Sequence, residues 1–383
     1  MLLRRAMISL MLAAFLVVPT RADEPPAGQP ATAEAVPEGS ADQAADPGEQ
    51  FQAVMADWRA LLARLQDLQK EFATADDERK AAIRTEFAAA VEEGEEMESK
   101  LIRAAEQALD ATDKSREEAA QLLVGVLRTE VDADNYEEAL RLGELLCEKT
   151  DDRRVVNLTG IAAFAAGDFD TAEKRLNQAA EQRTLSERAR AFLSDVPEYK
   201  RAWAREQKIR AAEAESDDLP RVSLKTNKGT IEIELFENEA PMAVANFVSL
   251  IEKGFYDGLT FHRVLPGFMA QGGCPDGTGT GGPGYNIPCE CHKPDHRRHF
   301  RGTLSMAHAG RDTGGSQFFL TFLPTSHLDG RHTAFGRVIS GMDVLAKLQR
   351  RDPGAANPPE PDRILEAKVL RKRDHAYEPT KVK

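Results

Sequence analysis

The spacing of hydrophobic residues divides this chain into an N-terminal helical part and a C-terminal β-rich part. From Phe51 to Ala105 the apolar residues recur at steps of three and four, which places them on one face of a helix. A polar break at residues 74–77 interrupts the pattern. We therefore predict two long helices that form an antiparallel hairpin or a short coiled coil.

A weak internal repeat follows these two helices. The segment DNYEEAL, residues 134–140, is echoed 33 residues later by GDFDTA, residues 167–172. This period is close to that of a tetratricopeptide (TPR) helix pair, in which a small residue after the aromatic lets adjacent helices approach. One unit is clear, whereas stacked arrays need about three, so helices predicted at 186–194 and 197–215 would act as caps. We predict an all-α, TPR-like domain over residues 51–216, with a generic helical bundle as the alternative.

Beyond Pro220 the hydrophobic period becomes two. Alternating apolar residues at 222–224 and 231–235 flank an Asn-Lys-Gly turn, which predicts a β-hairpin. Residues 241–253 return to helical spacing, and Pro241 falls in the first turn, where its missing N–H costs nothing. Short apolar strands with Gly-rich connections then lead to a second helix at 342–348 and a last strand at 364–370.

Composition and charge narrow the possible partners. The chain has 383 residues and a net charge of −13, so two or more domains are expected and a nucleic-acid partner is not. Residues 23–50 are rich in Pro, Ala, Gly, Asp and Glu and have no hydrophobic period. Such a segment cannot bury enough apolar surface to offset its chain entropy, so we predict a disordered linker.

The first 22 residues have the pattern of a signal peptide. Arg4 and Arg5 precede an apolar run at 6–18, and Thr20-Arg21-Ala22 places small residues at a cleavage site. The run is shorter than the roughly 20 residues that span a bilayer. We predict export to the periplasm or the extracellular space and no membrane association after cleavage. An uncleaved anchor is the alternative.

The stretch from Phe261 to His332 carries the candidate chemistry. One cation, Arg263, stands among apolar side chains and neutral amides, with no nucleophile beside a base and no carboxylate pair. This inventory suits a reaction that moves no proton and breaks no bond. Rotation about a prolyl peptide bond is such a reaction.

The same stretch closely resembles the cyclophilin family of peptidyl-prolyl cis-trans isomerases. FHR, PGFMAQGG, GTGTGGPGY, GSQFF and LDG-R-H occur in the family's order, and the resemblance covers about 221–373, which leaves 374–383 as a tail. It implies a closed antiparallel β-barrel of eight strands with two capping helices. It also implies an enzyme of protein folding that acts on proline-containing peptide segments and needs no cofactor and no metal.

The resemblance also assigns roles to residues. Arg263 would be catalytic, because a charged donor aimed at the prolyl nitrogen favours the twisted amide over its planar forms. His262 would be a support, and Phe318 would belong to the core. His327 replaces the family's usual Trp, which puts binding of cyclosporin-type ligands in doubt. His308 replaces its usual Asn, which should keep the backbone contact but could change the side-chain selectivity. The substrate-binding residues would be Phe268, Met269, Gln271, Ala307, His308, Gln317, Phe319, His327, Leu328 and His332.

Two further motifs admit several interpretations. Residues 277–282 match the dinucleotide pattern G-x-G-x-x-G, but the Pro-Gly-Tyr that follows cannot start a helix normally, so we predict a loop beside the peptide groove. Cys274, Cys289 and Cys291 could include a disulfide, as suits an exported protein, or could remain free thiols. The cysteines at 289 and 291, with His292, His296 and His299, also have a loosely zinc-like spacing.

A second function remains open at this stage. Because His327 replaces the usual Trp, the β-rich domain could bind proline peptides without catalysing their isomerisation. The chain would then be a scaffold whose helical region binds a protein partner.

Overall fold

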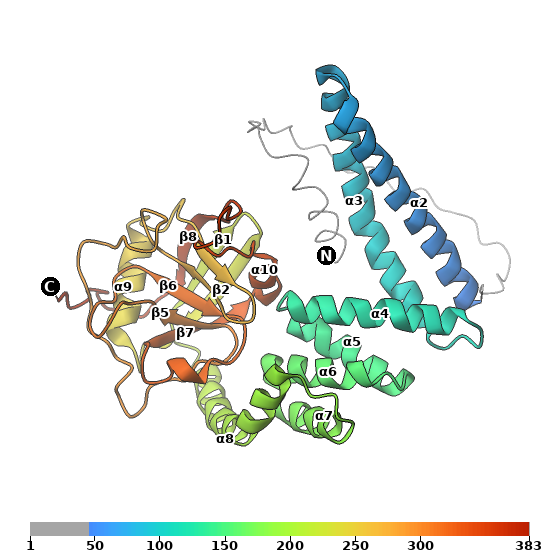
Figure 1. The fold of residues 1–383 in the computed structure, drawn as a ribbon. Coiled ribbons are helices and arrows are strands. Elements are labelled where there is room, and N and C mark those ends of the chain that lie inside the picture. Colours follow the sequence, from blue (N-terminus) through green and yellow to red (C-terminus); the bar gives the residue numbers. More distant parts are fainter. Residues whose placement is uncertain (1–45, 383) are drawn as a thin grey trace, which may run out of the picture. The chain divides into compact units, whose positions relative to one another are not determined.

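The computed structural model describes residues 46–382, which fall into two compact units that divide between Thr129 and Glu130. The predicted signal peptide and nearly all of the predicted linker lie outside the described residues. In the first unit, α2 (Pro47–Thr74) and α3 (Asp77–Ala108) run antiparallel (Figure 1), and α4 (Ser115–Asp132) follows them. The predicted helical hairpin is confirmed.

The hairpin packs through the apolar stripe that the sequence predicts. Phe51, Trp58 and Leu61 of α2 are buried, and so is Ile83 of α3. Gly94 contributes a close approach, since a Cβ there would stand 3.4 Å from a Leu61 methyl group. The first helix begins earlier than the predicted end of the linker at residue 50, because the Asp46 carboxylate accepts the Gly48 N–H at 2.7 Å and caps it.

The second unit begins with four packed helices, α5 (Tyr136–Lys149), α6 (Arg153–Ala166), α7 (Phe169–Glu181) and α8 (Glu187–Ser216). The two aromatic residues of the repeat, Tyr136 and Phe169, each open a helix and are buried. The prediction of two helices near 186–215 is wrong, because α8 continues through Pro197. Buried side chains on both sides of this proline, Val196 and Tyr199, hold the two halves of the helix in place although one backbone hydrogen bond is missing.

An eight-stranded antiparallel sheet forms the rest of the second unit. The predicted first hairpin is present, with Val222 opposite Ile233. Helices α9 (Pro241–Glu252) and α10 (Met342–Lys347) lie where the sequence predicts them, and Pro241 occupies the first turn of α9. The strands are β1 (Arg221–Thr226), β2 (Gly229–Leu235), β3 (Arg263–Leu265), β4 (Met269–Gly272), β5 (Thr303–Met306), β6 (Phe318–Thr321), β7 (Ala334–Ser340) and β8 (Ile364–Arg371).

The sheet is open, so the prediction of a closed barrel is wrong. The strand order is β3-β4-β6-β5-β7-β2-β1-β8, and the end strands β3 and β8 do not pair with each other. With only three residues, β3 is too short to close the sheet. Two isolated backbone bridges lie near these ends instead, between Thr260 and Arg363 and between Val264 and Arg351.

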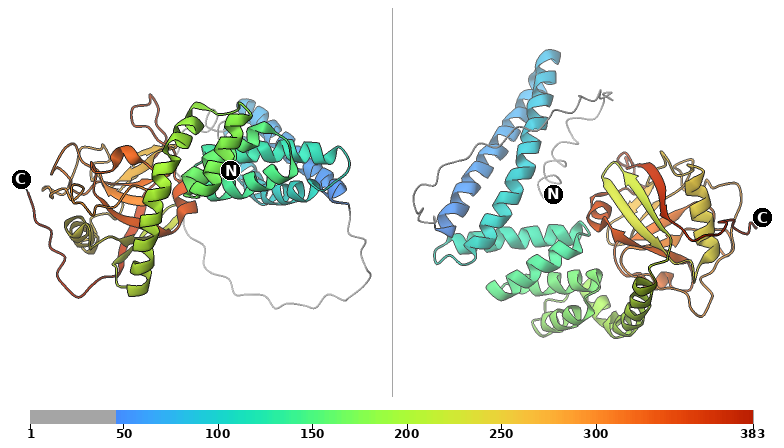
Figure 2. Two further views of the ribbon diagram at one scale, coloured as in Figure 1. Left: turned by 90° about the horizontal axis from the view of Figure 1, so that it is seen from below. Right: turned by 180° about the vertical axis from the view of Figure 1, so that it is seen from behind.

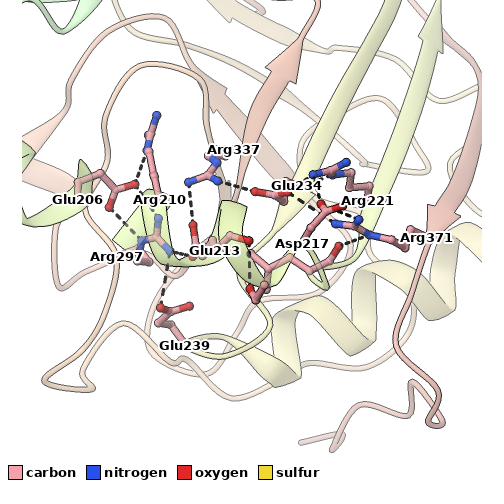
Figure 3. A network of polar contacts seen from close by, with 12 residues as sticks. Glu206, Arg210, Glu213, Asp217, Arg221, Glu234, Glu239, Arg297, Arg337 and Arg371 are labelled. Atoms are coloured by element: carbon pink, nitrogen blue, oxygen red, sulfur yellow. Dashed lines mark hydrogen bonds and ion pairs between the residues drawn. The ribbon is translucent and has the colours of Figure 1, made fainter. Parts of the chain in front are cut away.

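A buried network of charges joins α8 to the sheet (Figure 3). Arg297, in the loop between β4 and β5, donates to Glu206 at 2.6 and 3.0 Å and also binds Glu213. Glu213 accepts a bond from Arg337 of β7 at 2.8 Å, and Arg337 reaches Glu234 of β2 at 2.5 Å. All five side chains are buried, so each charge depends on the others for the interactions it has lost with water.

Aromatic rings extend the same contact. Phe300 of the loop before β5 lies 4.8 Å, ring to ring, from Trp203 of α8 and 6.2 Å from Tyr199. The structure therefore groups α5–α8 with the sheet in one compact unit. Over residues 46–382 no helix combines the length and the apolar character needed to cross a membrane.

Replacing Arg297 with Met should lower the free energy of unfolding by about 3–5 kcal/mol, because Glu206 and Glu213 lose a buried cation that compensates them. Urea denaturation of the full chain measures this loss. The matched control is Asp343→Asn, which removes an exposed ion pair with Lys347 and should cost less than about 1 kcal/mol. Equal losses in the two variants would contradict the role assigned to the network.

Candidate active site

A cavity of about 950 Å³ opens at the β3–β4–β6 end of the sheet. The structure brings together here nearly all the residues predicted to bind substrate, which come from segments far apart in the chain. The predicted site residues that line the cavity are Arg263, Phe268, Met269, Gln271, Ala307, His308, Gln317, Phe319, Leu328 and His332.

The pairing of three strands sets the chemistry of the cavity floor. Arg263 of β3 stands opposite Gln271 of β4, which stands opposite Phe319 of β6. Directly opposed residues point to the same face of a sheet, so these three side chains share one face. Their neighbour Phe318 points to the other face and is buried in the core, as predicted.

Arg263 is the cation of this cavity floor. Its guanidinium carbon lies 5.9 Å from the centre of the Phe268 ring. Among residues 46–382 the structure pairs it with no carboxylate. Gln271 donates to the Gln317 side chain at 3.0 Å, and this bond fixes the amide beside the cation.

Two histidines form the opposite wall. The His332 ring stacks on the His308 ring at 4.2 Å, and its Nδ1 is 2.9 Å from the Met306 carbonyl oxygen. Burial lowers the pKa of His332, so the ring is neutral at physiological pH. The Phe319 ring meets His332 edge to face at 5.6 Å. This wall therefore presents flat ring surfaces.

His327, predicted to bind substrate, does not line the cavity. It lies in the 3₁₀ turn Ser326–Leu328, whose successive side chains point in different directions, and Leu328 is the residue that faces the cavity. The His327 ring instead lies 5.6 Å from the Phe268 ring. It supports the apolar part of the site from the side.

His299 is a supporting residue that the sequence analysis missed. It is fully buried, its two ring nitrogens lie 2.9 Å from Asp329 and 2.8 Å from the Ser305 hydroxyl, and its ring stacks on Phe319 at 6.0 Å. It thus links the segment after Leu328 to the strand that carries Phe319. The sequence analysis considered His299 only as part of a segment with zinc-like spacing. It therefore did not predict this supporting role.

The glycine-rich loop lies along the cavity, as predicted. Gln317 donates to the Gly279 and Gly281 carbonyl oxygens, each at 2.9 Å, and this holds the loop as a wall. The C-terminal tail also reaches this wall, which the sequence did not predict. Val382 exchanges two backbone hydrogen bonds with Asn286, at 2.8 and 3.2 Å.

The cysteine-rich segment contains free thiols. Cys274, Cys289 and Cys291 are unpaired in the structure, so none of the disulfides considered above is present. The histidines of that segment also diverge, since His296 contacts the Lys293 carbonyl oxygen while His299 binds Asp329. Over residues 46–382 no group of three or more ligand side chains is arranged to hold a metal ion.

His262, the predicted support, directly precedes β3. Its side chain is buried, and neither ring nitrogen has a hydrogen-bond partner among the described residues. Burial is the main cause that lowers the pKa of His262 to about 4, and the nearby charges of Arg263 and Arg351 lower it further. The ring is therefore neutral at neutral pH.

Comparison with known proteins identifies the class to which this site belongs. Residues 221–369 match the family model described as cyclophilin type peptidyl-prolyl cis-trans isomerase/CLD. A peptidyl-prolyl cis-trans isomerase of Synechococcus elongatus is 67% identical over 147 residues, which cover 38% of this chain and 94% of the relative. One of Helicobacter pylori is 56% identical over 150 residues, covering 38% of this chain and 91% of the relative.

A solved cyclophilin-type isomerase of Cryptosporidium parvum, crystallised in the presence of the dipeptide Ala-Pro, is 34% identical. The aligned region covers 39% of this chain and 98% of the solved chain, with a TM-score of 0.36. From the sequence relatives, the chain belongs to the cyclophilin-type isomerase family through its C-terminal sheet. It is a peptidyl-prolyl cis-trans isomerase that carries an additional N-terminal helical region.

Acidification should destabilise the protein partly through His262. The pKa of His262 is lower in the folded chain than in the unfolded chain. Between about pH 6.5 and 4 the unfolded state therefore binds more protons than the folded state. The free energy of unfolding decreases as the pH is lowered through this range. Between pH 7 and pH 4.5 the His262→Leu variant should lose roughly 2 kcal/mol less of its free energy of unfolding than the wild type loses. Urea denaturation at both pH values measures it, and an identical fall in the two proteins would contradict the assignment.

Proposed function

We propose that Arg263 is the catalytic residue of this isomerase and that the cavity holds a proline while the preceding peptide bond rotates. The observation that carries this proposal is a guanidinium, unpaired with any carboxylate of residues 46–382, on the same sheet face as Gln271 and beside an apolar pocket. Amide resonance opposes the rotation with a barrier of ~18–20 kcal/mol. A catalyst must therefore bind the twisted amide more tightly than either planar form.

The charge of Arg263 supplies that preference. Twisting the amide ends its resonance and leaves a lone pair on the prolyl nitrogen. A donor aimed at this nitrogen gains a hydrogen bond that the planar amide cannot offer. An arginine keeps its charge throughout the physiological pH range, so the donor needs no proton transfer to become active.

The remaining residues hold the substrate still. Phe268, Met269, Phe319 and Leu328 surround a space with apolar surfaces, which suits a proline ring. Gln271, with Gln317 bonded to it, presents a neutral amide to the substrate backbone, and the backbone at Ala307-His308 lies on the other side. The ring is thereby fixed while the residue before it turns.

Arg263→Ala should reduce kcat/KM for an X-Pro peptide by about 10²–10³-fold, the usual effect of removing one preorganised donor. Exchange NMR on a short X-Pro peptide measures it. The matched control, Arg311→Ala, removes an exposed arginine that does not line the cavity and should keep wild-type activity. Equal acceleration by wild type and Arg263→Ala would refute the role of Arg263, and binding without acceleration by wild type would favour the scaffold function.

The activity should vary little with pH. His262, His327 and His332 all have lowered pKa values, chiefly through burial, so none of them changes charge above neutrality. We expect kcat/KM to stay within about twofold from pH 7 to 9, measured by exchange NMR. A bell-shaped profile in this range would indicate general acid–base catalysis instead.

We propose further that the substrates are exported proteins and that the helical region is TPR-like. Export is supported by the pattern of residues 1–22, and N-terminal sequencing of the mature protein tests it. The repeat is supported by Tyr136 and Phe169, which open equivalent helices, and by Ala139 and Ala172, which are fully buried three residues later. Such a region would offer a surface to a protein partner.

A further inference from the structure

The turn that carries the proline pocket is bonded to the helical region. β3 and β4 form a hairpin whose turn is Pro266-Gly267-Phe268, with Arg263 before it and Met269 after it. The backbone N–H of Gly267 donates to the Asp134 carboxylate at 2.7 Å. Asp134 lies between α4 and α5, at the start of the sequence repeat and outside the region that matches the cyclophilin family.

Asp134 is held rigidly at this point. Its side chain is buried, and three donors occupy it: Gly267, the Tyr136 hydroxyl at 2.8 Å and the Arg350 guanidinium at 2.7 Å. Its backbone φ is +61°, a conformation that Asp tolerates better than most residues. A carboxylate with several bonds at a fixed backbone position is a suitable anchor, because leaving any buried partner unbonded is costly.

Two neighbours reinforce the anchor. Arg188 of α8 donates to the Tyr136 hydroxyl at 2.6 Å, and its guanidinium lies against Gly267, where a Cβ would meet it at 3.4 Å. Arg351, next to Arg350, exchanges two backbone hydrogen bonds of 2.8 Å with Val264 of β3. The three-residue strand that carries Arg263 is thus held along its outer side and at its turn.

We propose that Asp134 is a positioning residue of the isomerase, which fixes the turn that contains Phe268 and so keeps Arg263 aligned with the proline pocket. The proposal rests on the isomerase site described above. A short edge hairpin has little rigidity of its own, and a displacement of about 1 Å at a reacting centre can cost up to ~10²-fold in rate. The helical region is on this view part of the catalytic architecture and not only a separate module for partners.

Asp134→Gly in the full chain removes the carboxylate while glycine accepts the positive φ without strain. We expect kcat to fall by at least about tenfold with a change in KM of less than about threefold, because alignment matters most in the transition state. The Gly267 amide should also exchange with solvent much faster than in wild type, as followed by NMR.

Asp134→Asn is the conservative variant. Its carbonyl oxygen can still accept the Gly267 and Tyr136 bonds, so it should keep at least about half of the wild-type kcat despite losing the ion pair with Arg350. The matched control is Glu137→Gln, which weakens a neighbouring contact to Arg301 without touching the turn. It should keep wild-type kcat.

Several results would overturn the proposal. They are wild-type kcat in Asp134→Gly, equal losses of kcat in Asp134→Gly and Glu137→Gln, or an Asp134→Asn variant as impaired as the glycine variant. If Asp134→Gly does not fold, the wild-type chain still decides, because a Gly267 amide that exchanges as fast as an exposed turn amide refutes the anchor. A wild-type chain that does not accelerate exchange would count against the isomerase assignment, whereas an active wild type with an equally active Asp134→Gly counts only against this role.

Discussion

Compensation of buried charge is the constraint on which the second unit depends. Arg297 has almost no contact with solvent, and its charge is balanced by Glu206 and Glu213, both contributed by α8. The pairing of Arg297 with Glu239, inside the sheet domain, is longer, at 3.6 Å, so the helix supplies its close partners. The sequence region that matches the isomerase family therefore does not satisfy all of its own buried groups. The helices and the sheet share them, as the close view in Figure 3 shows, and the ribbon views in Figure 2 show α8 beside the sheet.

The active site also depends on contacts with residues that are remote in the sequence. Arg263 lies on the shortest strand of the sheet, at its edge, where pairing on one side gives the least support. The missing support comes from residues remote in the sequence, Arg351 on the backbone of β3 and Asp134 at the turn. The proposed mechanism uses charge and geometry without covalent chemistry, so its rate enhancement depends on how well the cation and the pocket are aligned.

The sequence predicted the elements better than it predicted their long-range contacts. Periodicity located the helical hairpin, the first β-hairpin and α9, because each depends on residues close in the chain. The resemblance distinguished Phe319 from Phe318, and strand alternation explains that distinction. The open sheet, the continuous helix through Pro197, the displaced His327 and the role of His299 depend on contacts between distant segments. No local pattern encodes such contacts, and the bond between Asp134 and Gly267 joins residues 133 positions apart.

The open ends of the sheet bear on whether another chain could pair with its edge strands. A free strand edge offers unpaired N–H and C=O groups that another chain can extend. Here segments without regular structure form backbone hydrogen bonds with one residue of each end strand. Gly258 and Leu259 bond both backbone groups of Ile364 on β8, and Arg351 does the same for Val264 on β3. Short stretches of irregular chain thus occupy part of each edge, at Ile364 and at Val264, where another strand would otherwise be able to pair.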